Sequence, residues 1–503
     1  MDLDAAKARN GELEVALAAA SARADAFYAR ALAADARALA ADARALAAEA
    51  RADAAEARIA VLEKEVAELL EKLSKNSSNS NKPPSSDGPG NRAQRREKAA
   101  KKRTGTRKRG GQPGHPGSSR ALIPPEDVDE VVDHYPPECE SCWKPLPQTP
   151  DAKAERYQTV ELPPVRPYTV EHRRHCVTCP FCAYTTTASY ADIPTTPFGP
   201  RLTSIVALLT GVFHVSRRSA GRLLEDILGT RISLGAISAI EARVSDALKG
   251  AVDEAWTEVG QAPVKHTDGT SWYQSGVYCA LWTIAVASAT VFKIVTNGTK
   301  PVLEKLFPKK DGILVSDRAT ALMFWAMDRR QVCWAHLLRK FISFSEQKKT
   351  KAIGKELLDY VGIMFAYWDD VKRGGMARDE FREKMKPLRL QVEAALARGV
   401  ATGIKSFAGS CEDMLEHRDA LWTFVDRDDV EPTNNHAERE LRAFVLWRKR
   451  SFGTQSDRGN LFAERIMTVV HTARKQNRNV LAFLTACTTA ARAGTPPPSL
   501  FSA

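Results

Sequence analysis

The sequence lacks any hydrophobic run long enough to cross a membrane. Its most apolar stretch, Val277 to Phe292, is shorter than a bilayer span requires. The N-terminal residues also lack the apolar segment that is typical of a signal peptide. Together these two absences predict a soluble, cytoplasmic protein that has no membrane partner.

A disulfide framework is missing too, although the chain contains nine cysteines. Five of them fall between Cys139 and Cys182, and the other four are scattered through segments that are predicted to form core elements. Clustered cysteines of this kind indicate metal binding in a reducing compartment rather than a set of disulfides.

The clustered cysteines lie within residues 121–195 and form Cys-x-x-Cys pairs that suit tetrahedral Zn²⁺. Each preferred pair fits one tight turn, and short β-branched stretches between the pairs predict a small zinc-ribbon-like module. The preferred quartet is Cys139, Cys142, Cys179 and Cys182. Four other residues remain open as replacement ligands, namely Cys176, His134, His172 and His175.

Acidic residues are scarce in the second half of the segment 74–120. The segment begins with SKNSSNSNKPPSSDGPGN, whose composition predicts a disordered linker. Ten Lys or Arg then occur between Arg92 and Arg109 with a single acid, Glu97, in a chain whose formal charge is +12. This composition favours an arm that binds DNA phosphates, and a solubilising tail is the alternative. The candidate contacts are Arg103, Arg107, Lys108 and Arg109.

Residues 1–73 are rich in alanine and contain a seven-residue repeat, visible as ARALAAD, ARALAAD and ARALAAE. The last turns place aliphatic side chains at the a and d positions of the repeat, namely Ile59, Leu62, Val66, Leu69 and Leu73. Such a seam needs a partner to bury it, so we predict a coiled coil that joins copies of the chain into a homo-oligomer. A solvated single helix is the alternative for the early repeats.

Residues 196–255 show a helical pattern that is broken at Gly229 to Ile232, with Ser233 placed to cap the second helix. The pattern predicts a helix-turn-helix-like segment. Its second helix, Ser233 to Arg243, would fit the major groove of DNA. A plain helical packing unit is the alternative.

Residues 256–346 contain three strand-like runs, PVKHTDGTSWY, VYCALWTIAVASA and TVFKIV, with Ser275-Gly276 as the first turn. A short helix, the strand GILVSD, another helix, the strand QVCW and a last helix follow. The order βββαβαβα is the core of a ribonuclease-H-like fold. It places Asp268 on the first strand and Asp317 at the end of the fourth, where neighbouring strands bring them together.

A third acid is expected from a later helix within residues 427–503. The motif TNNHAERELR offers Glu438 near the start of a helix that Thr433 or Asn434 would cap, with Glu440 close by. Three carboxylates suit a two-metal site, because hard oxygen ligands balance the charge of two Mg²⁺ or Mn²⁺ ions.

Basic residues accumulate on the same helix, and contact with the DNA backbone is their simplest use. The candidate contacts are Arg439, Arg442, Arg448, Lys449 and Arg450. Cys333-x-x-His336 also has the spacing of metal ligands, but no second pair accompanies it nearby, so zinc is not expected there. If His336 faces the acids, it would position a substrate phosphate.

Several segments together resemble one known family, the insertion sequence 66 family of DDE transposases. The resemblance rests on SKNSSNSNKPPSSD, KRGGQPGHPG, the paired cysteine motifs, HTDGTSW, VSDRATA, CWAHLLRKF, TNNHAERELR and RKRSFGTQSDRGNLFAERIMTVVHTARKQNRNVLAFL. It implies a DNA transposase in which Asp268, Asp317 and Glu438 are the catalytic acids and residues 347–426 form an α-helical insertion. Accessory proteins of the same element are possible partners.

One position departs from the family pattern. The first acid of the family is often followed by Glu-Thr, whereas Gly269-Thr270 follows Asp268 here. Glycine has no side chain to bind a metal, so a role for a neighbouring acid is lost while the role of Asp268 is unaffected.

The whole chain is therefore predicted to be a multidomain α+β protein. Its parts are a coiled coil, a zinc-ribbon-like module, a helix-turn-helix-like segment and a ribonuclease-H-like α/β catalytic domain with an α-helical insertion. The predicted function is metal-dependent cleavage of element ends and strand transfer into target DNA. A catalytically inactive zinc-containing DNA-binding regulator, derived from a transposase, is the main alternative, and a coiled-coil scaffold is the other.

Overall fold

The computed structural model describes residues 3–74, 79, 120–151, 153–190, 193–307 and 309–501. The chain divides into two compact units, Met1–Ser78 and Asn79–Ala503. Nearly all of the predicted linker and basic arm lies outside the described residues. The same is true of the four DNA contacts proposed there, Arg103, Arg107, Lys108 and Arg109.

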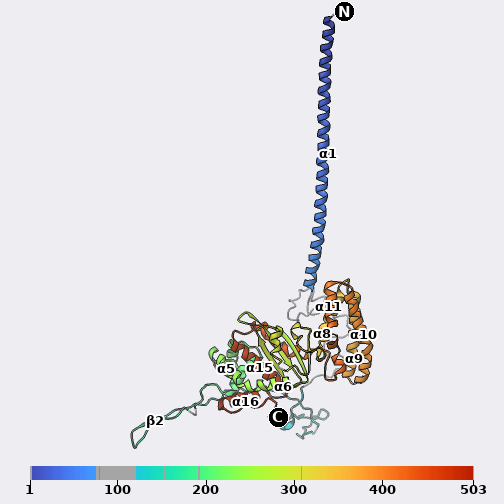
Figure 1. The fold of residues 1–503 in the computed structure, drawn as a ribbon. Helices are drawn as coiled ribbons and strands as arrows, with labels where there is room; N and C mark the ends of the chain where they lie inside the picture. Colours follow the sequence, from blue (N-terminus) through green and yellow to red (C-terminus); the bar gives the residue numbers. More distant parts are fainter. Residues whose placement is uncertain are drawn as a thin grey trace. The chain divides into compact units, whose positions relative to one another are not determined.

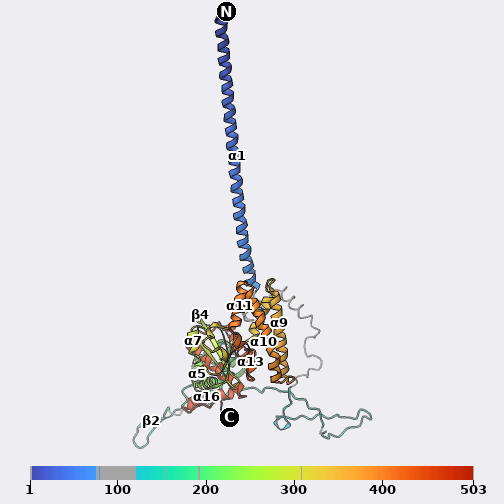
Figure 2. The same cartoon turned by 45° about the vertical axis from the view of Figure 1, so that its right-hand side comes forward.

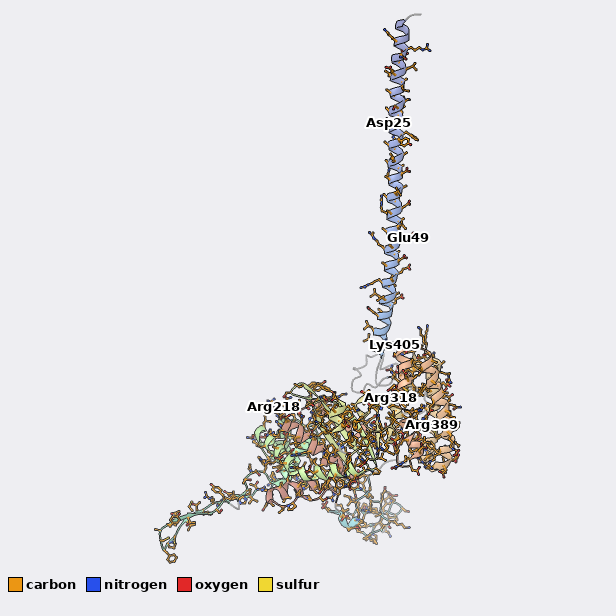
Figure 3. All side chains as sticks on the ribbon, viewed as in Figure 1. Asp25, Glu49, Arg218, Arg318, Arg389 and Lys405 are labelled. Carbon is orange, nitrogen blue, oxygen red and sulfur yellow. The ribbon has the colours of Figure 1, made fainter. Side chains whose placement is uncertain are left out.

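The first unit is one helix, α1 (Leu3–Ser74), which begins well before the heptad repeat becomes regular. Ala, Glu, Leu and Arg dominate it, and these residues have the highest helix propensities. The five aliphatic residues at a and d spacing are between 46% and 81% exposed. Side chains such as those of Asp25 and Glu49 project from the helix along its length (Figure 3). The seam that was predicted to pack in a coiled coil is thus open in this unit.

The cysteine-rich segment has little regular structure. A short 3₁₀ turn, η2 (Pro125–Asp127), precedes a hairpin of two strands, β1 (Cys176–Thr178) and β2 (Thr185–Thr187), which pair in antiparallel register. Most of its large apolar side chains are exposed, including Tyr157 and Phe181.

A helical segment follows, and it has the break that the sequence predicted. Its elements are α3 (Pro200–Ala207), a π-helical turn (Leu208–Val212), α4 (Arg217–Leu228), α5 (Leu234–Ala247) and α6 (Lys249–Gln261). Gly229 ends α4 with a left-handed φ of 62°, a conformation that favours glycine. The Ser233 side chain accepts a hydrogen bond from the Ala236 N–H, which confirms Ser233 as the cap of α5.

The centre of the second unit is a mixed sheet with strand order β5-β4-β3-β6-β7 (Figure 1). Its strands are β3 (Val264–Gln274), β4 (Val277–Ala285), β5 (Thr290–Val295), β6 (Ile313–Ser316) and β7 (Arg330–Val332). The first three form the predicted antiparallel meander, with Ser275 and Gly276 in the turn. The strands β6 and β7 continue the sheet in parallel with β3.

The connections between strands differ from the prediction at one place. A short helix, α7 (Lys300–Glu304), precedes β6 as expected, but no α-helix lies between β6 and β7. Two 3₁₀ turns, η4 (Thr320–Leu322) and η5 (Met327–Arg329), replace it. The predicted helix is wrong because tertiary contacts hold this segment: Trp325 is buried and its indole N–H donates to the Gly312 carbonyl at 3.3 Å.

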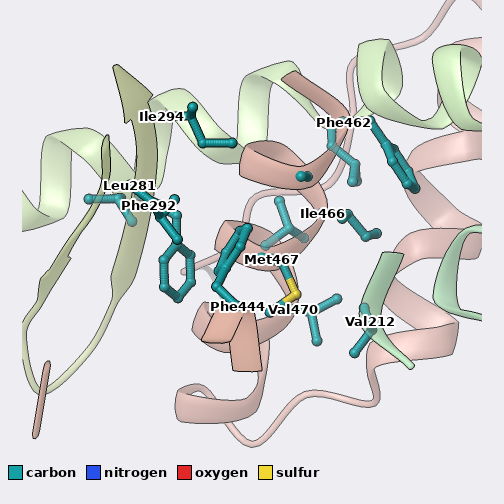
Figure 4. Packing of buried hydrophobic residues seen from close by; sticks show 14 of the residues in the cluster. Val212, Leu281, Phe292, Ile294, Phe444, Phe462, Ile466, Met467 and Val470 are labelled. Atoms are coloured by element: carbon teal, nitrogen blue, oxygen red, sulfur yellow. The ribbon is translucent and has the colours of Figure 1, made fainter. Parts of the chain in front are cut away.

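Helices cover both faces of the sheet and complete two hydrophobic cores. On one side, α3 to α6 pack with three helices that follow the insertion, namely α14 (Asn435–Ser451), α15 (Asp457–Lys475) and α16 (Val480–Ala493). Phe292 of β5 and Phe444 of α14 meet there with ring centroids 4.9 Å apart. Figure 4 shows these rings beside Ile466, Met467 and Val470 of α15.

The second core joins the opposite face of the sheet to the helices that follow β7. Those helices are α8 (Trp334–Glu346), α9 (Lys351–Lys372), α10 (Arg378–Ala401), α11 (Lys405–Glu416), α12 (Arg418–Leu421) and α13 (Thr423–Asp426). Helices α9, α10 and α11 lie side by side (Figure 2). Trp368, Phe381 and Phe424 pack together at the centre of this bundle. Residues 347–426 are therefore helical, as the predicted insertion requires.

The edge strand β5 is closed by side chains of α15. The backbone N–H groups of Thr290, Phe292 and Ile294 donate to Thr472, Thr468 and Glu464, at 3.1, 3.1 and 2.7 Å. Along a strand, the N–H groups of every second residue are about 6.7 Å apart. Along a helix, residues four positions apart are separated by about 6 Å, so side chains of α15 match the spacing of the donors on β5. This contact removes an exposed edge from the sheet.

Among the described residues, none of the helices is both long enough and apolar enough to span a bilayer.

Candidate active site

Two acidic residues lie beside each other where β3 and β6 run in parallel. The register pairs His266 of β3 with Val315 of β6, so two residues further along Asp268 lies next to Asp317, which directly follows β6. Neighbouring strands are about 4.8 Å apart. The sequence placed both acids correctly in the sheet.

Glu438 reaches the same place from the first turn of α14. Asn434 holds the start of this helix against the sheet, because its side-chain N–H donates to the Thr267 carbonyl at 2.7 Å and its backbone N–H donates to Cys333 Sγ at 3.1 Å. The Asn434 side chain makes no capping bond to the helix. Asn434 thus stands at the predicted N-cap position, but its side chain fixes α14 to β3 instead of capping the helix.

The charges of the three acids act on one another. Burial and, after it, the nearby carboxylates of Asp317 and Glu438 raise the pKa of Asp268 to about 8, although the Gly269 N–H and Arg339 act in the opposite direction. Three carboxyl groups gathered in one place create a site of strong negative potential. Such a site is suited to a divalent cation.

Two residues of α8 complete the surroundings of Glu438. His336 Nδ1 lies 3.6 Å from Glu438 Oε1, and Arg339 Nη2 lies 3.8 Å from Glu438 Oε2. Both His336 Nδ1 and Glu438 Oε1 are buried without a hydrogen-bond partner. His336 therefore faces the acid cluster. This is the orientation that its predicted role with a substrate phosphate requires.

The structure also groups Cys333 with these residues, whereas the sequence predicted no zinc site at Cys333 and His336. Ligand atoms of Cys333, His336 and Glu438 all lie within 4.8 Å of one another. The Cys-x-x-His spacing was visible in the sequence, but the third donor comes from 102 residues after His336. Only the fold brings it there.

Glu440 is engaged elsewhere. It accepts a hydrogen bond from His471 Nδ1, and Lys475 Nζ and His436 Nε2 lie 3.6 and 3.9 Å away. Burial acts to raise the pKa of Glu440, but His471, Lys475 and His436 together lower it. Of the two glutamates that the sequence left close together, only Glu438 acts on the pKa of Asp268.

Packing against Trp282 explains why glycine follows Asp268. Gly269 pairs with Trp282 of β4, and a Cβ at position 269 would lie 2.8 Å from the indole ring. The Trp282 ring occupies the space that a side chain at 269 would need. A larger residue after Asp268 is therefore incompatible with this tryptophan.

Two arginines, Arg318 and Arg330, anchor the segment that carries Asp317. Arg318, labelled in Figure 3, forms an ion pair with Asp413 of α11. The buried Arg330 donates to the Asp317 carbonyl at 3.2 Å. The helical insertion thus helps to fix the second acid.

The basic residues predicted to contact DNA divide into two groups. Arg439, Arg442, Lys449 and Arg450 are exposed on α14. Arg448 is partly buried and donates to Thr270 Oγ1 at 3.0 Å and to the carbonyl and hydroxyl of Ser271. Arg448 therefore ties α14 to β3, and the exposed four are available to a ligand.

The two cysteine knuckles have the same backbone structure. The Cys139 N–H donates to the Lys144 carbonyl and the Trp143 N–H to the Cys139 carbonyl, each at 2.9 Å; Cys179 makes the equivalent bonds with Tyr184 and Ala183. Trp143 and Ala183 both have φ of 58°. Backbone N–H groups two and three residues on lower the pKa of the Cys139 and Cys179 thiols.

Cys176 lies outside the second knuckle, on β1, where its Sγ is 3.1 Å from Thr187 Oγ1. Within the described residues, the four knuckle cysteines do not come together as one group of donors. Their joint binding of one zinc ion stays a prediction.

Comparison with family models places the chain among the transposases. The model described as Transposase IS66 family matches residues 195–461, just over half of the 503 residues, and the chain belongs to this family. The match contains all three acids and neither knuckle. A second model, a family of unknown function (DUF6444), matches residues 32–121. No curated protein was found to match the chain.

Asn434→Ala is expected to lower the free energy of unfolding by about 1–3 kcal/mol, because it leaves the buried Thr267 carbonyl without its donor. Thermal or urea unfolding measures the change. Asn435→Ala is the matched control, since Asn435 is exposed one position further along. Equal stability of the two variants would show that Asn434 does not anchor α14.

Proposed function

We propose that this chain is the transposase of a bacterial insertion sequence, and that it cuts the ends of its element and joins them to target DNA. Membership of the family supports transposase activity and DNA as the substrate. The observation that carries the detailed proposal is the meeting of Asp268, Asp317 and Glu438 from a strand, a strand end and a helix. The strand order supports a ribonuclease-H-like catalytic domain.

The acid cluster fits Mg²⁺ or Mn²⁺ on its own chemistry. All three donors are carboxylates, which hard divalent cations prefer. Burial and, after it, the neighbouring carboxylates raise the pKa of Asp268, and a bound cation would offset both effects. Glu438 Oε1 is also buried without a hydrogen-bond partner. Asp268, Asp317 and Glu438 are the residues that would hold the metal.

The reaction is a phosphoryl transfer that needs no covalent enzyme intermediate. Bound metal ions would activate the attacking oxygen and stabilise the leaving oxygen. His336 and Arg339 lie beside Glu438 and would orient the scissile phosphate, because they offer an imidazole and a guanidinium donor there. The first step uses water to free a 3′-hydroxyl, and the second uses that hydroxyl to attack target DNA.

DNA binding is proposed for three regions. The exposed basic residues of α14, Arg439, Arg442, Lys449 and Arg450, would contact the backbone near the acids. The basic arm from Arg92 to Arg109 would add contacts that do not read sequence. Helices α4 and α5 would present a helix-turn-helix-like surface, supported by the exposed Arg218, Arg222 and Arg231 beside the start of α5.

The coiled coil is proposed to bring copies of the chain together through the exposed seam of α1. Two element ends could then be processed in one complex. Accessory proteins of the element remain possible further partners.

The zinc module is proposed to bind one Zn²⁺ through both knuckles. We expect metal analysis of the full chain to find about one zinc per chain less in Cys139→Ser or Cys179→Ser than in the parent, because each substitution removes one of the four thiolates of this module. Cys176→Ser is the matched control, since Cys176 lies on β1 outside the turn. Full zinc content in both knuckle variants would refute the quartet.

The proposed function is tested by incubating the purified chain with Mg²⁺ or Mn²⁺ and DNA that carries the terminal repeats flanking its gene. The expected result is cleavage at the repeat ends and products joined to target DNA. Specific binding of the repeats without cleavage, under conditions where the protein is folded and metal is present, would favour the inactive regulator instead.

A further inference from the structure

A thiol, an imidazole and a carboxylate meet at the junction of α8 and α14, beside the acid cluster. They belong to Cys333, His336 and Glu438, whose ligand atoms all lie within 4.8 Å of one another. We propose that these three residues form a site for a soft divalent cation such as Zn²⁺, and that the cation inhibits the enzyme by withdrawing Glu438 from catalysis. The inhibition, but not the binding, rests on the proposed function.

Two buried polar atoms of this group have no hydrogen-bond partner. His336 Nδ1 and Glu438 Oε1 are buried, 3.6 Å apart, and neither has a hydrogen-bond partner. Buried polar atoms are rarely left in this state, and each one calls for an explanation such as an ion. A cation between the imidazole and the carboxylate satisfies both atoms.

The sulfur of Cys333 is enclosed at the start of α8. Cys333 is fully buried directly before α8, and its Sγ accepts the Asn434 backbone N–H at 3.1 Å. Burial raises the pKa of the Cys333 thiol to about 11, although the Asn434 N–H acts in the opposite direction, so a cation has to displace the thiol proton when it binds. On binding, the thiol proton would pass to the buffer and the cation would replace it.

The donor set decides which metal fits. Mg²⁺ prefers oxygen ligands, whereas a thiolate with an imidazole suits Zn²⁺ or Co²⁺. Three protein ligands leave the fourth position of a tetrahedral ion open to water or a substrate oxygen. The soft cation therefore competes for Glu438 with the hard cation that the reaction uses.

The binding is tested with Co²⁺, whose thiolate complexes absorb light in the near ultraviolet. The protein is the full chain in which serine replaces the four knuckle cysteines, Cys139, Cys142, Cys179 and Cys182, so that they contribute no signal. We expect one Co²⁺ per chain with a thiolate band that Zn²⁺ abolishes. Absence of the band would overturn the proposal.

Further substitutions in the same background identify the ligands. Cys333→Ser should abolish the band, and His336→Gln should weaken Co²⁺ binding at least about tenfold. Cys411→Ser is the matched control, because Cys411 is equally buried but lies in the insertion. Far-ultraviolet circular dichroism checks the fold of each variant. A band that survives in folded Cys333→Ser, or unchanged binding in His336→Gln, would refute the site.

The inhibition is read as the ratio of DNA cleavage rates with and without Zn²⁺ at constant Mg²⁺. The ratio should fall at least about tenfold for the background protein and stay closer to one for Cys333→Ser. Equal ratios would reject the inhibition. If no cleavage occurs at all, the proposed function fails, while the cobalt spectrum still decides whether the site exists.

Discussion

Asp268→Asn is expected to reduce cleavage of element ends by roughly a thousandfold or more, because it removes a ligand of the proposed metal site and the charge that holds the cation. Asp317→Asn and Glu438→Gln should have comparable effects. The rate of strand cleavage under single-turnover conditions measures all three. A variant that cleaves as fast as the parent would remove its residue from the triad.

Glu440→Gln is the informative control, since Glu440 lies two positions from Glu438 on the same helix. Its partners are His471, Lys475 and His436, so the substitution should lower the melting temperature and leave cleavage per folded molecule largely intact. Loss of cleavage in folded Glu440→Gln, with retention in Glu438→Gln, would exchange the roles assigned to the two glutamates.

The same Asp268→Asn substitution should stabilise the metal-free protein. The pKa of Asp268 is about 8 in the folded chain, against an ordinary value of 3.8. Between pH 3.8 and pH 8, Asp268 is therefore protonated in the folded chain and ionised in the unfolded chain. Stability that depends on this proton is lost as the pH rises from about 4 to 8. At pH 8, with metal removed, we expect Asn at 268 to raise the free energy of unfolding by about 2–5 kcal/mol.

Mg²⁺ provides the second half of this test. It should raise the melting temperature of the parent at pH 8 and have little effect on Asp268→Asn, because a ligand stabilises only the state that binds it. Asp226→Asn is the control, since Asp226 is an exposed aspartate on α4. A parent whose melting temperature is the same at pH 5 and pH 8 without metal would contradict the pKa shift.

Local patterns in the sequence predicted those parts of the fold that local physics determines. The meander followed from three strand-like runs and the Ser275-Gly276 turn, and the cap of α5 followed from Ser233. Asp317 was placed because an apolar run ends just before it. The helix predicted between β6 and β7 failed because the burial of Trp325 outweighs the helix propensity of its neighbours.

Long-range contacts decided the rest of the candidate site. Glu438 and Glu440 are equivalent in sequence, and only the position of His471 and Lys475 on α15 separates them. Arg448 was expected at DNA but bonds to β3, because the packing of α14 turns it inward. Glu438, which completes the group with Cys333 and His336, follows the helical insertion in the sequence. A short-range spacing motif cannot predict a ligand that is so distant in the chain.

The closure of β5 by α15 has a consequence for synthesis of the chain on the ribosome. Glu464 follows its partner Ile294 by 170 residues, so the edge strand is made long before the helix that covers it. At about 5–20 residues per second, the nascent sheet would expose this edge for roughly 10–35 s while the insertion is translated. Chains that terminate before α15 would keep an open strand beside an incomplete core, the condition that promotes aggregation. Glu438 is also synthesised after the insertion, so the proposed acid cluster is incomplete until then. A chain that ends before Glu438 would be both inactive and prone to aggregate.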